Sequence, residues 1–237
     1  MIKHIAFALI IVFGVHSEAF AAPVNGNLPQ SSPVPGVQSG KVTYTSIKKL
    51  APPVRKMIET DLNEQPFGTG RRFGEISDDA VVYMENYQTQ IKNVSDIEKN
   101  LTFKLADVSR GDLKKYILEG AYPEGPTKAG PWSSVTRVFK RDDGVIVMLH
   151  EWNYVGDGGG GVMIVEELMN AKIGNTPARL SVKQSPTGRM SSELTWVTKH
   201  RLFTVTVLDD VPEGNKAKYN LAWLTRLAAG IREPSSR

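Results

Sequence analysis

Short runs of apolar residues alternate with turn-forming residues between Trp132 and Val207, and this pattern dominates the chain. Residues 135–140 and 145–154 are rich in β-branched and aromatic side chains, and an Asp-Gly pair at 143–144 separates them. Asp-Gly between two such runs predicts a tight hairpin, because glycine takes the positive φ that the turn requires. The stretch as a whole therefore predicts an antiparallel sheet.

The second strand of this hairpin alternates regularly from His150 onward. His150, Trp152 and Tyr154 fall on one face of the predicted strand, and Glu151 falls on the other. A glycine-rich segment, residues 156–161, follows at once. Consecutive glycines have a high ordering cost and nothing to pack, so this segment predicts a loop.

A second hairpin is predicted near the end of the sheet. If the chain reverses at residues 199–200, Trp196 faces Phe203 and Leu194 faces Val205, with all four on one face. A slip of one residue would scatter this pattern, so the register is well specified.

Residues 216–231 repeat apolar side chains at helical spacing and predict a closing helix. The apolar positions are Leu221, Leu224, Leu227, Ala228 and Ile231. This stripe needs an apolar surface, and the Trp196/Phe203 face of the last hairpin is the nearest candidate.

The N-terminal part of the chain favours helices. Residues 44–62 predict one or two short helices, and residues 77–91 fit helix and strand patterns almost equally, with helix preferred. Residues 101–108 predict a strand, and residues 109–120 predict a helix that begins with a capping-box-like pattern. Residues 121–131, rich in proline and glycine, predict a loop.

These elements predict an α+β fold: an antiparallel sheet with a closing C-terminal helix and helices in the N-terminal third. One domain is expected over residues 41–237, with a possible helical part at 41–131 and a sheet part at 132–231.

Residues 1–21 have the three parts of a secretory signal peptide: a basic start, an apolar run at 5–15 and a small-residue cleavage site at 19–21. The apolar run is shorter than the ~20 residues that a membrane-spanning helix needs. Residues 22–40 are rich in proline and serine and predict a flexible leader. We therefore expect a periplasmic or secreted bacterial protein without stable membrane insertion after signal cleavage.

Composition excludes several kinds of chemistry. The 237-residue chain has no cysteine, so it forms no disulfide, and its four histidines give little material for a structural zinc site. Its net charge is +4, but the basic residues are scattered, so we expect no nucleic-acid partner. Neither the phosphate-loop pattern nor the dinucleotide fingerprint occurs, and no cofactor or metal is predicted.

The sharpest candidate for chemistry is the cluster of His150, Glu151 and Asp157 beside the glycine loop, where an imidazole and a carboxylate could activate water. However, His150 and Glu151 point to opposite faces of a strand, and a packed histidine is the commoner outcome, so no catalytic residue is assigned. If this region binds a ligand, the predicted binding residues are Trp152, Tyr154 and Asp157.

A family resemblance rests on the order of apolar motifs toward the end of the chain. These motifs are Ala178-Arg179-Leu180, Leu194-Thr195-Trp196, Phe203-Thr204-Val205, and then Leu224, Leu227 and Ala228. This order resembles the last strands and closing helix of extracytoplasmic sensor domains of anti-sigma-factor regulators. The resemblance implies a non-enzymatic, half-open sheet with a helix across it that binds a partner or an apolar ligand.

The function expected from the sequence is that of an exported accessory or binding protein of the cell envelope, without enzymatic activity. Its partner would be an envelope protein or a small apolar ligand. The alternative is a periplasmic hydrolase that uses the His150/Asp157 region.

Overall fold

The computed structural model describes residues 11–13, 41–63, 72–124, 130–156, 161–214 and 218–234. The predicted leader and all of the predicted signal peptide except Ile11–Phe13 lie outside these described residues.

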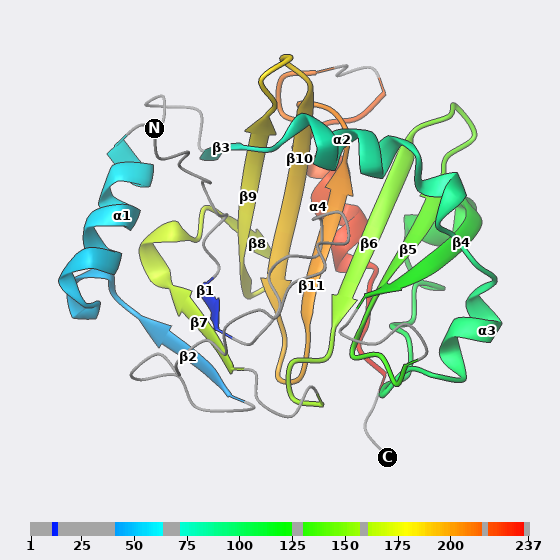
Figure 1. The fold of residues 1–237 in the computed structure, drawn as a ribbon, viewed down its shortest axis with the longest axis horizontal. Helices are drawn as coiled ribbons and strands as arrows, with labels where there is room; N and C mark the ends of the chain where they lie inside the picture. Colours follow the sequence, from blue (N-terminus) through cyan, green and yellow to red (C-terminus); the bar gives the residue numbers. More distant parts are fainter. Residues whose placement is uncertain are drawn as a thin grey trace.

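A large, mostly antiparallel sheet forms the centre of the fold, with strand order β3-β9-β10-β11-β6-β5-β4 and β8 paired to β9 (Figure 1). Its strands are β3 (Arg72–Glu75), β4 (Ile117–Glu124), β5 (Ser134–Lys140), β6 (Ile146–Trp152), β8 (Ala171–Ile173), β9 (Thr176–Gln184), β10 (Met190–Val197) and β11 (Leu202–Val207). Only β3 pairs in parallel. The predicted antiparallel sheet is therefore confirmed.

A smaller sheet lies beside the large one and has the order β1-β7-β2 (Figure 1). It consists of β1 (Ile11–Phe13), β7 (Gly161–Val165) and β2 (Val42–Thr45). β7 is buried along its whole length, because its alternate side chains enter two apolar clusters: Met163 and Val165 join one of them, and Val162 and Ile164 join the other.

Four α-helices and four short 3-10 helices connect the strands among the described residues. The α-helices are α1 (Pro52–Asn63), α2 (Asp78–Glu85), α3 (Val94–Glu98) and α4 (Leu221–Ala229). The 3-10 helices are η1 (Ile47–Lys49), η2 (Tyr87–Thr89), η3 (Asp112–Lys115) and η4 (Glu166–Leu168). Within the described ranges, no helix has the length and apolar character needed to cross a bilayer.

The ambiguous stretch at 77–91 is helical at its start. Ser77 caps α2 by accepting a hydrogen bond from the Ala80 N–H, and Asp78 and Asp79 occupy the first turn, where the helix dipole favours negative charge.

Two sequence predictions between residues 101 and 131 are wrong, and the loop predicted over 121–131 is wrong in its first four residues. The expected strand at 101–108 forms only isolated bridges, and the expected helix at 109–120 is reduced to η3. The second half of that helix and the start of the expected loop form β4, which pairs along its length with β5.

The reason lies at Gly120, where the sequence predicts the end of a helix. Its φ of +155° accompanies a break in register between β4 and β5, so the glycine marks a bulge within a strand. A Cβ on Gly120 would come within 2.9 Å of the Lys92 carbonyl oxygen, so glycine also permits the close approach of the segment that bridges Lys92 to Ala121.

The two faces of the large sheet differ in what covers them. α4 packs behind one face, here called the apolar face, where Leu224 and Leu227 join the core that contains Trp196 and Phe203 (Figure 1). The predicted closing helix and its packing surface are thus confirmed, although the helix begins at Leu221. On the opposite face, here called the polar face, α2 crosses one end of the strands (Figure 1).

Both predicted hairpins are confirmed, the second with its predicted register. In the first, Gly144 has a φ of +89° and donates its N–H to the Arg141 carbonyl. In the second, Trp196 lies opposite Phe203 and Leu194 lies opposite Val205. The rings of Trp196 and Phe203 stack with centroids 5.2 Å apart.

We predict that Trp196→Ala and Phe203→Ala each lower the free energy of unfolding by about 3–5 kcal/mol, because each leaves a cavity beneath α4. Since the rings touch, the double variant should lose less than the sum of the two single losses. Urea unfolding of the three variants measures this, and strictly additive losses would contradict the direct contact.

Candidate functional site

A row of hydrogen-bonding side chains crosses the polar face at one level, with each member opposite the next on the neighbouring strand. In spatial order the row is Tyr122, Thr136, His150, Thr204, Thr195 and Arg179. A sheet face in the middle of a domain is ordinarily apolar, and the apolar face of this sheet follows that rule. Apolar packing of the sheet therefore does not account for this row of polar side chains.

His150 is the centre of the strongest polar cluster in this row. Its Nδ1 lies 3.2 Å from the Thr136 hydroxyl and 3.4 Å from Oε1 of Glu124, and its Nε2 lies 3.4 Å from the Ser134 hydroxyl. Thr136 donates its hydroxyl hydrogen to Glu124 at 2.7 Å. With that hydrogen committed, the Thr136 oxygen is left to accept from the imidazole, which assigns the proton of a neutral His150 to Nδ1.

The protonated form of His150 is favoured by its neighbours. Burial lowers the pKa of His150, but the Glu124 carboxylate opposes this through its charge and its hydrogen bond, and Glu151 and Glu193 add smaller contributions. The net result is a pKa above the ordinary value of 6.5.

Two polar atoms beside His150 lack partners among the described residues. They are Oε2 of Glu124 and the hydroxyl of Tyr122, both buried. Burial and then the Glu124 charge raise the pKa of Tyr122. The ring of Tyr83, from α2, meets the Tyr122 ring edge-on at 6.2 Å. The cluster is thus a polar site whose hydrogen bonding is incomplete.

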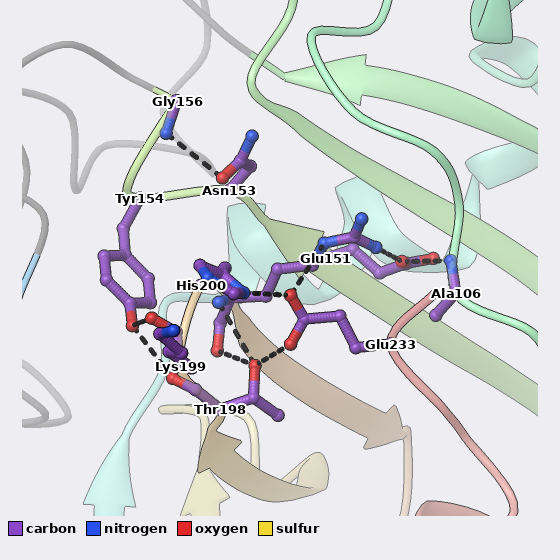
Figure 2. A network of polar contacts seen from close by, with 10 residues as sticks. Ala106, Glu151, Asn153, Tyr154, Gly156, Thr198, Lys199, His200 and Glu233 are labelled. Carbon is purple, nitrogen blue, oxygen red and sulfur yellow. Dashed lines mark hydrogen bonds and ion pairs between the residues drawn. The ribbon is translucent and has the colours of Figure 1, made fainter. Parts of the chain in front are cut away.

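Glu151, next to His150 in the sequence, points to the apolar face and has a different role. Its carboxylate is fully buried and forms ion pairs with Arg137 at 2.6 Å and Arg201 at 3.4 Å. It also accepts the Ala106 N–H at 2.8 Å (Figure 2). Arg137 also donates to the Ala106 carbonyl, and Arg201 lies 4.7 Å from the centre of the Phe103 ring. These contacts hold residues 103–106 onto the sheet.

The same network continues to the turn between β10 and β11. Glu233 accepts hydrogen bonds from Thr198 at 2.5 Å and from His200 Nδ1 at 2.9 Å, and both partners belong to that turn (Figure 2). Tyr154 donates its hydroxyl to the Thr198 carbonyl at 2.8 Å and the Lys199 carbonyl at 2.5 Å (Figure 2). The network anchors the turn and the end of the chain after α4.

The residues predicted to bind a ligand do not form one surface in the described part of the chain. Tyr154 is fully buried and serves the turn, so its ring is not presented to solvent. Trp152 is half-buried and meets Tyr154 at 6.0 Å. Asp157 lies outside the described residues. The structure does bring His150 to a carboxylate, but that carboxylate belongs to Glu124.

Sequence reasoning missed Glu124, Tyr122, Thr136 and Ser134 as neighbours of His150. The alternation of Ser134, Thr136 and Val138 gave a signal for one side of the cluster, since these residues share a strand face. The other side of the cluster belongs to β4, whereas the sequence predicts a loop over residues 121–131.

Among the residues with assigned positions, no group of three or more His, Asp or Glu side chains is placed to hold a metal ion. No protein-family model, no curated protein and no solved structure matches this chain. The functional argument therefore rests on the site itself.

We predict that Glu124→Gln lowers the pKa of His150, because burial then outweighs the remaining attractions. In the parent, the folded pKa exceeds 6.5, so the pair's stabilisation is full below pH 6.5 and is lost as the pH rises through the folded pKa. NMR titration of the imidazole measures the shift. Glu193→Gln should move the pKa less, and an unchanged pKa in Glu124→Gln would contradict the pairing.

Proposed function

We propose that this protein is an exported, non-enzymatic binding protein of the cell envelope, and that the polar face around His150 is its binding surface. The three-part pattern of residues 1–21 supports export. The observation that carries the binding role is the row of hydrogen-bonding side chains from Tyr122 to Arg179.

The chemistry of this face favours a polar partner. The row combines three threonine hydroxyls, those of Thr136, Thr195 and Thr204, with an imidazole and a guanidinium, and an apolar ligand placed over it would desolvate polar groups. Of the partners expected from the sequence, an envelope protein with a polar contact surface therefore fits better than a small apolar ligand. The resemblance to anti-sigma-factor sensor domains is compatible with such a binding role.

A hydrolase is the second candidate, and one observation favours it. Ser134, His150 and Glu124 lie in the order of a nucleophile, a base and an orienting carboxylate, with the tautomer that such an arrangement needs. Against it, β5 lies between β4 and β6, so its backbone N–H groups are engaged in the sheet rather than directed at a developing oxyanion. A raised pKa also leaves His150 less available as a base near neutral pH.

The export step predicts that protein recovered from the periplasm or medium begins at or near Ala22. N-terminal sequencing checks this, and membrane-bound material that retains Met1 would contradict it.

A photo-crosslinking residue in place of Tyr83, which is 37% exposed beside the polar cluster, should form adducts in exporting cells. The matched control is Ile117, which is 63% exposed at the start of β4. An equal yield of crosslinked adducts at the two positions would contradict the proposal that the polar face is the binding surface.

The hydrolase alternative is tested in the same preparation with a serine-reactive fluorophosphonate. The binding role predicts no labelling of Ser134. Labelling of the parent that disappears in Ser134→Ala would replace the binding proposal with a hydrolase.

A further inference from the structure

A cavity of about 300 Å³ lies at the end of the large sheet where two neighbouring strands part. The ladder between β6 and β11 ends at the Met148–Thr206 pair, although both strands extend beyond that pair. Residues 145–146 line the cavity from the start of β6, and residues 207–208 line it from the end of β11. The hollow therefore lies where the ladder between these strands has stopped.

Side chains from both sides of the sheet form the walls of the cavity. Met84 of α2 and Tyr87 belong to the apolar cluster on the polar side of the sheet, whereas Tyr219 belongs to the cluster around α4. α2 crosses this end of the strands (Figure 1). Glu85 and Gly144 also line the cavity and are exposed, so the cavity opens to solvent beside them.

The charge balance of the cavity favours a neutral ligand. Glu85 is the one charged residue among the described residues that line it, and its carboxylate forms an ion pair with Arg189 at 2.7 Å. The Tyr219 hydroxyl is also engaged, because it donates to Asp209. A charged ligand would lose its hydration in this cavity and would have to compete with Arg189 for its counter-charge.

We propose that this cavity binds a small, neutral aromatic molecule of one or two rings. An engineered apolar cavity of about 150 Å³ takes up benzene and stays free of water, so a cavity of about twice that volume suits a second ring. Tyr87 and Tyr219 supply aromatic walls, and the Met84 thioether supplies a sulfur–aromatic contact. The inference goes beyond the binding role of the polar face and does not depend on it.

The test is a titration of the purified protein with indole, a neutral aromatic molecule of two rings, followed by NMR of the methionine methyl groups. The Met84 signal is assigned by its loss in Met84→Leu. The Met163 signal, assigned in the same way, is the reference, because Met163 belongs to the separate cluster beside the small sheet. We expect a saturable shift of the Met84 signal and no shift of the Met163 signal.

Two substitutions fill the cavity from opposite strands. Val145→Trp places an indole ring where the ligand would lie, so it should weaken indole binding by about tenfold or more. Leu208→Trp should do the same from the other wall, and it keeps the test decisive if Val145→Trp does not fold. Thermal melting of each variant shows that the fold is retained.

Val155→Trp is the matched control, because it makes the same change at a residue that is 40% exposed beyond the opposite end of β6. It should leave the affinity for indole unchanged. Indoleacetate and tryptamine are the matched probes, since they add a carboxylate or an ammonium group to the same ring system. Each should bind about tenfold more weakly than indole, because its charge loses hydration without a free partner.

Four results would overturn the proposal. Absence of a saturable Met84 shift would mean that the cavity takes up no aromatic molecule, and equal shifts of Met84 and Met163 would mean non-specific partitioning. Unchanged affinity in a folded Val145→Trp or Leu208→Trp variant would place the indole elsewhere. Tighter binding of tryptamine than of indole would assign a cationic ligand that pairs with Glu85.

Discussion

The buried carboxylate of Glu151 is the interaction on which the rest of the structure depends. It is held between the guanidinium groups of Arg137 and Arg201 and by the Ala106 N–H. A charge in this position is tolerated only when fully paired, because removing one partner leaves another charge buried and uncompensated. The network joins strand β6 to strand β5 and to the turn after β10. It also joins β6 to residues 103–106, a segment with almost no secondary structure of its own.

The alternation of side chains along strand β6 therefore places two different polar networks on the two faces of the sheet. Glu151 points into the apolar face and fixes the fold, while His150 points to the polar face, where Glu124 and Thr136 orient its imidazole. An imidazole and a carboxylate that are adjacent in sequence thus belong to different networks. The carboxylate that does act on His150 comes from the edge of the sheet, where the bulge at Gly120 lets β4 pair with β5.

The sequence predicted the features that local patterns determine. The turn at Gly144, the Trp196/Phe203 register and the closing helix each depend on a few neighbouring residues, and each is confirmed. β4 was missed because the spacing of Leu113 to Ile117 fits a helix, and only pairing with β5 shows that the chain is extended. The candidate site was missed with it, because Glu124 and Tyr122 meet His150 only across that pairing.

The central claim is that Glu151 holds the segment containing Ala106 onto the sheet, and hydrogen exchange of the Ala106 amide tests it most directly. Its N–H donates to a buried carboxylate, so in the parent it should exchange as slowly as the amides of the central strands. In Glu151→Gln its protection should fall by more than that of the Val205 amide, which lies in the middle of the sheet. Equal losses of protection at the two amides, or none at Ala106, would contradict the account.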